Sequence, residues 1–141
     1  MSIYTQLYLH CIWATWDRLP LIQPTYEQQL YAVLLNKCTK LGCNALAVGG
    51  TTDHIHLLIS FTSTITIAKL VGEIKGTSSH AMTHIIAPET FFKWQGGYGA
   101  LTIGKRSLSQ VQAYILNQKQ HHANGNTIRS LECWDAINEI T

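Results

Sequence analysis

The chain has 141 residues and a formal net charge of +2 at pH 7 with histidine neutral, so its overall charge does not identify a nucleic-acid partner. Its composition, 46% apolar and 13% charged, excludes a disordered chain and fits one folded domain over residues 1–141. No apolar run reaches the roughly 18 residues of a membrane span, and the N-terminus lacks signal-peptide features, so we expect a cytoplasmic protein with no membrane association.

The chain begins with a predicted strand and a predicted helix. Residues 3–16 are rich in β-branched and aromatic residues and predict a strand, which Leu19-Pro20 ends. Residues 24–41 carry apolar side chains at helical spacing and predict the first helix. Gly42 stands where the glycine that ends a helix is expected.

The middle of the chain predicts two more strands and a second helix. Residues 44–49 and 54–60 read as short strands, and Gly49-Gly50 is expected to turn the chain between them. The threonines within 62–66 are suitable N-caps for a helix. An apolar stripe over 67–74 predicts that this helix follows.

The last third predicts a fourth strand and a third helix. Residues 91–103 read as a loop that enters a strand. A helix is predicted over 107–122, where its first residue and Gln110 form a capping-box pattern, and Asn124-Gly125-Asn126 ends it. The short tail, 127–141, is expected to dock on a neighbouring element. Its apolar residues for this purpose are Ile128, Leu131 and Trp134.

The predicted order is strand, helix, strand, strand, helix, strand, helix. Its first six elements follow the ferredoxin-like (RRM-like) βαββαβ order. We therefore expect an α+β fold with an antiparallel sheet, helices on one face, and an additional C-terminal helix. The core should cover about residues 3–123, with a tail at 124–141. Because many functions use this fold, the function must be argued from particular residues.

Two histidines, His54 and His56, stand one residue apart in the third predicted strand. Alternate side chains of a strand share a face, so both imidazoles point the same way, with Cα atoms about 6–7 Å apart, and can close on one metal ion. The alternative is that both simply lie on a solvent-exposed face. Asp53 precedes them and either ends the turn or touches the site.

The last predicted helix offers a third ligand and a nucleophile. Tyr114 and Gln118 are four residues apart and share a helix face. The Gln118 carboxamide oxygen is a hard ligand that suits Mg²⁺ or Mn²⁺, and His121 and His122 are its rivals. A partly buried tyrosine with a polar neighbour is the alternative. A phenol, with a pKa of about 10, needs a strongly polarised electrophile, and a metal-bound phosphodiester is one.

Four stretches in this order carry a family resemblance: HCIWATWDRLPLI (10–22), DHIHLLIS (53–60), KWQGGYGALTIG (93–104) and YILNQKQHH (114–122). Over about residues 3–123 the chain resembles the single-tyrosine HUH transposases of the insertion sequence 200/605-like family. Relatives of that family include the transposases associated with repetitive extragenic palindromes. Trp16 and His80 stand where many relatives are expected to carry basic residues.

The resemblance implies a role for each candidate residue. His54 and His56 become ligands of Mg²⁺ or Mn²⁺, with Gln118 as the third ligand and His121 or Asp53 as further candidates. Tyr114 becomes the nucleophile that cuts single-stranded DNA at hairpin-bearing element ends, leaving a 5′-phosphotyrosine and a free 3′-OH that later rejoins strands. The family is implied to work as a homodimer, so the tyrosine acts either in cis or in trans.

Contacts to DNA are predicted for two sets of residues. Basic residues suited to phosphates are Arg18, Lys69, Lys75, Lys93, Lys105, Arg106 and Lys119. Aromatic residues suited to stacking on unpaired bases, with core packing as the alternative, are Trp13, Trp94 and Tyr98. Two other functions stay open at this stage: a non-catalytic single-stranded nucleic-acid-binding module, and a metal phosphodiesterase that uses water.

Overall fold

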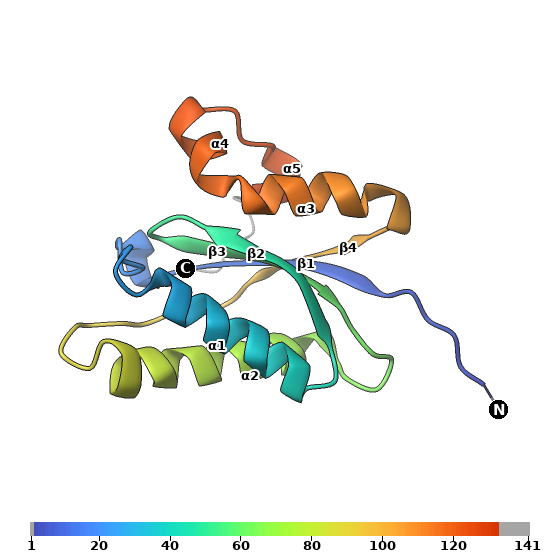
Figure 1. Ribbon diagram of the computed structural model, residues 1–141, viewed down its shortest axis with the longest axis horizontal. Coiled ribbons are helices and arrows are strands. Elements are labelled where there is room, and N and C mark those ends of the chain that lie inside the picture. The colour runs from blue at the N-terminus through green and yellow to red at the C-terminus, as the bar shows by residue number, and fades with distance from the viewer. Residues whose placement is uncertain (1, 133–141) are drawn as a thin grey trace.

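The computed structural model describes residues 2–132 and shows a four-stranded antiparallel sheet with helices on both faces (Figure 1). The strands are β1 (Tyr8–Ala14), β2 (Asn44–Gly50), β3 (His54–Ser60) and β4 (Gly99–Ile103), in the spatial order β2-β3-β1-β4. The α-helices are α1 (Glu27–Lys40), α2 (Ile67–Ala81), α3 (Leu108–Leu116), α4 (Gln118–Asn124) and α5 (Arg129–Glu132). Three further helical segments are not α-helical: η1 (Trp16–Arg18) and η3 (Lys105–Ser107) are 3₁₀ turns, and η2 (Met82–Ile86) is a π-helical turn. The predicted ferredoxin-like α+β fold is confirmed.

The helices form two layers, one on each face of the sheet. α1 and α2 cover one face, while α3, α4 and α5 lie over the other (Figure 1). The C-terminal helices therefore cover a sheet face that the simplest ferredoxin-like arrangement leaves to solvent.

Every helix within residues 2–132 is too short or too polar to span a membrane.

β3 is buried on both of its faces. On the α1 and α2 side its apolar residues enter the main core; these are Ile55, Leu57 and Ile59. On the other side Leu58 packs against Val111 of α3. His54 and His56 share that second side and are only 1% and 0% exposed. The alternative in which the two histidines lie on a solvent face is therefore wrong, because the C-terminal helices cover them.

One predicted turn is misplaced. Gly49 and Gly50 do not turn the chain, since both belong to β2 and pair with His56 and Ile55 of β3. The turn lies at Thr51–Asp53 instead, where the Thr51 N–H donates to the His54 carbonyl. The sequence pattern misled because glycine is typical of turns.

Gly49 is needed where it is because α3 passes directly over β2. A Cβ atom at Gly49 would lie 2.0 Å from the Ile115 carbonyl oxygen, so backbone would have to move. We predict that Gly49→Ala lowers the free energy of unfolding by about 1–3 kcal/mol, measured by chemical denaturation. Gly72→Ala is the matched control, because a Cβ there meets open space on a helix and should be neutral or stabilising. An unchanged midpoint for Gly49→Ala would contradict the close approach of α3.

The predicted helix over 107–122 is broken into α3 and α4. Asn117 leaves helical geometry at φ −107° and ψ 25°, and its side-chain amide donates to the Ala113 carbonyl at 2.9 Å. Such a side-chain bond competes with the helical ladder. The capping-box prediction is wrong, since the Ser107 side chain makes no capping hydrogen bond. The predicted end is confirmed, because Gly125 is left-handed at φ 68° and closes α4.

Candidate functional site

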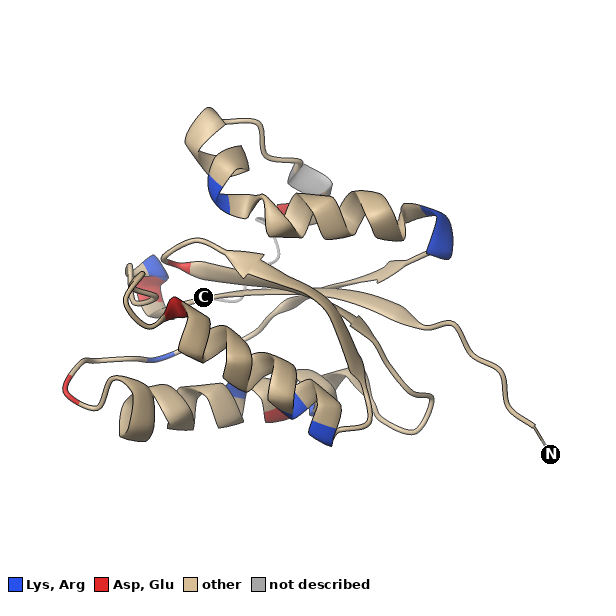
Figure 2. Cartoon of the chain, viewed as in Figure 1, with Lys and Arg blue, Asp and Glu red and all other residues tan. Residues whose placement is uncertain are grey.

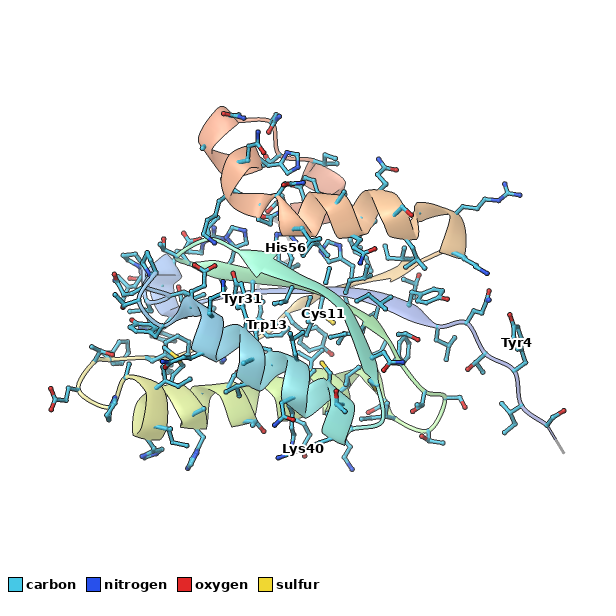
Figure 3. All side chains as sticks on the ribbon, in the orientation of Figure 1. Tyr4, Cys11, Trp13, Tyr31, Lys40 and His56 are labelled. Carbon is cyan, nitrogen blue, oxygen red and sulfur yellow. The ribbon has the colours of Figure 1, made fainter. Side chains whose placement is uncertain are left out.

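The centre of the site joins the middle of the sheet to α5. His54 and His56 project from β3, and Glu132 reaches them from α5, all three being buried. The Glu132 Oε1 atom lies 3.2 Å from His56 Nε2 and 3.5 Å from His54 Nε2. Figure 3 shows His56 between the sheet and the C-terminal helices. One ligand atom from each residue lies within 4.8 Å of the others, so the three can hold one metal ion.

α4 adds a carboxamide and a further imidazole. The Gln118 Oε1 atom lies 3.2 Å from His54 Nε2, and the Gln118 amide donates to Glu132 Oε2 at 3.2 Å. His122 Nε2 lies 3.1 Å from Gln118 Oε1 and 3.3 Å from Glu132 Oε1. This first turn of α4 directly follows the break at Asn117. The structure thus brings the predicted Gln118 to the histidines, together with His122, one of its two predicted rivals.

His121 points elsewhere. Its Nδ1 atom lies 3.1 Å from the Asn126 side-chain oxygen, and its ring stacks on Tyr114 with centroids 4.6 Å apart. These contacts orient the tyrosine and do not reach the histidine pair of β3.

Tyr114 lies beside the same centre. Its hydroxyl donates to Glu132 Oε2 and accepts from the Ile128 N–H at 3.0 Å. Its ring is 6.0 Å from that of His56, centroid to centroid, within one chain. Burial and the Glu132 carboxylate raise the pKa of the Tyr114 phenol to about 12, so the hydroxyl is neutral at pH 7.

The Nδ1 atom of His54 has partners separate from those of its Nε2 atom. The Asp53 carboxylate and the Thr51 hydroxyl each lie 2.9 Å from His54 Nδ1. Arg18 in turn lies 3.4 Å from that carboxylate. A carboxylate on the Nδ1–H of an imidazole leaves its Nε2 lone pair free for a metal. Asp53 was predicted either to end the turn or to touch the site. It does both, since it lies in the turn and contacts His54.

The protonation states of His56 and Glu132 suit a cation. Burial lowers the pKa of His56 to about 4, despite the nearby Glu132 carboxylate, so this imidazole is neutral at pH 7. Burial works against ionisation of Glu132, but hydrogen bonds with His54 and His56 outweigh it and hold the pKa far below its usual range. For His54, burial is likewise outweighed by the bonds to Asp53 and Glu132, so its pKa is raised. The ionised Glu132 and the neutral His56 are in metal-binding forms, whereas a cation would have to displace the additional proton that the raised pKa favours on His54.

Asp53 should make stability depend on pH. Burial alone would raise the pKa of this carboxyl, but the hydrogen bond with His54 and the charge of Arg18 lower it to about 2. A depressed pKa stabilises the folded state above the ordinary value of 3.8, and this stabilisation is lost as pH falls toward 2. We predict that Asp53→Asn lowers the melting temperature at pH 6 and that its deficit shrinks between pH 4 and 2. A deficit independent of pH would contradict this assignment.

Two of the lysines predicted to bind DNA have structural partners. Lys75 donates to the carbonyls of Gln95 and Gly97 at 2.7 Å each, and burial lowers its pKa to about 8. Lys119 forms an ion pair with Glu27 of α1. These contacts hold the loop before β4 and the start of α4 against the rest of the fold.

Other basic residues lie around the edges of the sheet. Lys93 places its ammonium group 3.9 Å from the ring centroid of Trp16, so a positive charge does stand where the sequence has tryptophan. Lys105 and Arg106 are exposed in η3, the blue segment before α3 in Figure 2. DNA contacts of these residues stay predictions.

The two tryptophans that were predicted to stack on unpaired bases belong to the core. Trp13 is 1% exposed and Trp94 is 6% exposed, and their rings meet edge to face with centroids 5.8 Å apart. The indole N–H of Trp94 donates to the Ser78 hydroxyl at 2.9 Å. Core packing is therefore the confirmed alternative for both residues.

Glu132 is a site residue that the sequence did not indicate. The tail was expected to dock through apolar residues, and Leu131 does pack against the cluster between β3 and α3. Trp134 lies outside the described residues. A glutamate beside a docking leucine was the available signal, but nothing in a four-residue helix indicates which way its carboxylate faces.

Comparison with known proteins gives a family. The model of the family described as "Transposase IS200 like" matches residues 3–118. Among curated proteins, the ISDra2 transposase TnpA of Deinococcus radiodurans is 28% identical over 119 aligned positions, and the match covers 80% of this chain and 84% of that protein.

Solved structures agree with this family. A Deinococcus radiodurans protein described as a transposase superposes with a TM-score of 0.66 at 28% identity, over 84% of this chain and 95% of that one. A REP-associated tyrosine transposase bound to a REP hairpin superposes with a TM-score of 0.64 at 16% identity, over 90% of this chain and 76% of that one. The second likeness shows the fold.

Proposed function

The chain belongs to the IS200-like transposase family, and we propose that it cleaves and rejoins single-stranded DNA through a covalent bond to Tyr114. Membership of this family identifies the chain as a transposase. The reaction of this particular chain is inferred from the contacts among its own side chains.

One observation carries the proposal: a single carboxylate joins the nucleophile to the metal-binding residues. Glu132 accepts a hydrogen bond from the Tyr114 hydroxyl through Oε2 and faces both imidazole Nε2 atoms of His54 and His56 through Oε1. A phosphodiester bound to an ion that these residues held would therefore lie on the same carboxylate as the Tyr114 hydroxyl. Neither a water-using phosphodiesterase nor a binding module requires a tyrosine at this point.

The donor set fits a small divalent cation. It contains two imidazole nitrogens and one carboxylate oxygen, and the Gln118 carboxamide oxygen is close enough to join them. Oxygen-rich sets with imidazole suit Mg²⁺ and Mn²⁺, and we propose one of these as the cofactor. When bound, the ion would supply Lewis-acid polarisation of the scissile phosphate.

Three residues of the chain have separate roles in the proposed cleavage. The Tyr114 oxygen attacks phosphorus, the bond from phosphorus to the 3′-oxygen breaks, and the products are a 5′-phosphotyrosine and a free 3′-OH. His121 stacks on the Tyr114 ring and the Ile128 N–H binds its oxygen, so both hold the nucleophile in place. Attack of a 3′-OH on the phosphotyrosine reverses these bond changes and rejoins a strand.

We propose hairpin-bearing single-stranded ends as the substrate. The supporting relative is the REP-associated tyrosine transposase, whose structure is bound to a REP hairpin. We further propose a homodimer, as the family resemblance implies. Since Tyr114 contacts Glu132 of its own chain, the arrangement described here corresponds to a site completed in cis.

The function is tested with hairpin oligonucleotides taken from the DNA that flanks the gene. The protein is incubated with single-stranded and double-stranded forms, with Mn²⁺ or with a chelator, and the products are run on a denaturing gel. A slow protein–DNA band is expected only with single strands and metal. Cleavage without such a band would indicate a water-using phosphodiesterase. Metal-independent binding without cleavage, on flanks that carry both ends, would indicate a binding module.

A further inference from the structure

A third buried histidine, His10, lies behind the site. It belongs to β1, next to β3 in the sheet, and is 0% exposed. Its Nε2 atom lies 2.8 Å from Nδ1 of His56, and the two rings stack with centroids 5.0 Å apart. His10 thus contacts the side of the His56 ring that faces away from Glu132.

The other nitrogen of His10 has no partner. Its Nδ1 atom is buried and makes no hydrogen bond to any residue in 2–132. A buried polar atom without a partner costs about 1–3 kcal/mol, so an apolar side chain of similar size would suit this position better for stability alone. The contact with His56 is therefore the single polar interaction of this ring among the described residues, and it is what distinguishes histidine from leucine here.

The chemistry of that contact follows from the two nitrogens of His56. For its Nε2 lone pair to face a cation, the proton of a neutral imidazole must sit on Nδ1. That Nδ1–H then needs an acceptor, and the Nε2 atom of His10 is in position to be one. His54 meets the same need differently, since its Nδ1 faces the Asp53 carboxylate.

We propose that His10 is a positioning residue of the metal site, which accepts the Nδ1–H of His56 and so turns the Nε2 lone pair of His56 toward the ion. This inference rests on the metal site in the proposed function. It assigns the two ligating histidines different supports, a neutral imidazole for His56 and a carboxylate for His54.

The first test measures Mn²⁺ affinity of the full chain by calorimetry. His10→Leu removes the acceptor and is expected to weaken binding about 10- to 100-fold, as loss of an outer hydrogen-bond partner of a metal ligand does. His10→Gln, which offers a carbonyl oxygen in place of Nε2, should retain most of the affinity. Ile12→Val is the matched control, because Ile12 lies opposite His56 in the sheet register and offers no acceptor.

The second measurement reads the tautomer directly. Long-range ¹H–¹⁵N NMR of the Mg²⁺-loaded protein should show His56 protonated at Nδ1 in the wild type and in His10→Gln, and a mixture of tautomers in His10→Leu. The melting temperature of His10→Leu should stay close to that of the wild type, because the substitution removes the unpartnered His10 nitrogen while it leaves the His56 Nδ1–H without an acceptor, and this separates positioning from folding.

The outcomes are distinguishable. Wild-type binding of Mn²⁺ with equal affinity in His10→Leu would overturn the role of His10 and leave the proposed function standing. Equal losses in His10→Leu and His10→Gln would overturn it too, because the acceptor would then not be what matters. A wild type that binds no Mn²⁺ would overturn the metal site itself, and the role of His10 with it.

Discussion

Replacing Tyr114 with phenylalanine is expected to abolish the covalent protein–DNA adduct and the strand cleavage that accompanies it. The variant keeps the ring that packs on His121 and removes only the oxygen that is proposed to attack phosphorus. Loss of a nucleophile commonly costs about 10⁴-fold or more in rate, so no band should be seen at any practical time. The measurement is the denaturing gel with Mn²⁺ and single-stranded hairpin substrate.

Stability has to be checked in the same variant. Tyr114→Phe also loses the hydrogen bonds to Glu132 and to the Ile128 N–H, and a buried acceptor left without its donor costs about 1–3 kcal/mol. Tyr31→Phe is the matched control, since Tyr31 is a buried tyrosine of α1 on the opposite side of the sheet. The control should form the adduct at the wild-type rate. Full-rate cleavage by Tyr114→Phe would rule out the tyrosine mechanism.

Glu132→Gln is expected to weaken Mn²⁺ binding at least as much as the loss of an outer partner does, about 10- to 100-fold. The substitution keeps the size of the side chain but removes its negative charge, which is the only carboxylate in the group formed with His54 and His56. Calorimetric titration of Mn²⁺ at pH 7 measures the effect. The adduct should decrease in parallel.

The same titration compares Glu132 with the third ligand predicted from sequence, Gln118. A neutral carboxamide binds a divalent ion less strongly than a carboxylate, so Gln118→Ala should cause the smaller loss of affinity. Glu89→Gln, in the exposed loop before β4, is the charge-matched control and should bind like the wild type. A large loss in Gln118→Ala with none in Glu132→Gln would show that Glu132 serves the tyrosine alone.

Local patterns were enough for the sheet and for much of the site. The alternation of β3 placed His54 and His56 on one face because successive side chains of any strand point to opposite sides. Helical spacing placed Tyr114 and Gln118 near each other even though the helix is broken between them, since the break at Asn117 leaves the two residues on adjoining turns. The order of elements implied the fold by the same local reasoning.

Contacts between distant segments could not be obtained in this way. Glu132 is 76 residues from His56, and His10 is 46 residues from it. Neither belongs to a motif whose spacing relates it to β3. Likewise, the burial of the histidine face depends on α3 crossing β2 at Gly49, which a glycine pair in a sequence does not reveal.

The sequence by itself therefore determined the order of elements, the ferredoxin-like fold, the pair of histidines on one face and the tyrosine helix, because these follow from periodicities that each segment carries alone. Only the tertiary structure decided that this face is buried, that Glu132 joins Tyr114 to the histidines, and that His10 stands behind His56. The physical reason is that hydrogen bonds between side chains require positions set within a few tenths of an ångström. Such positions arise when the packing of the whole sheet and its two layers of helices is complete.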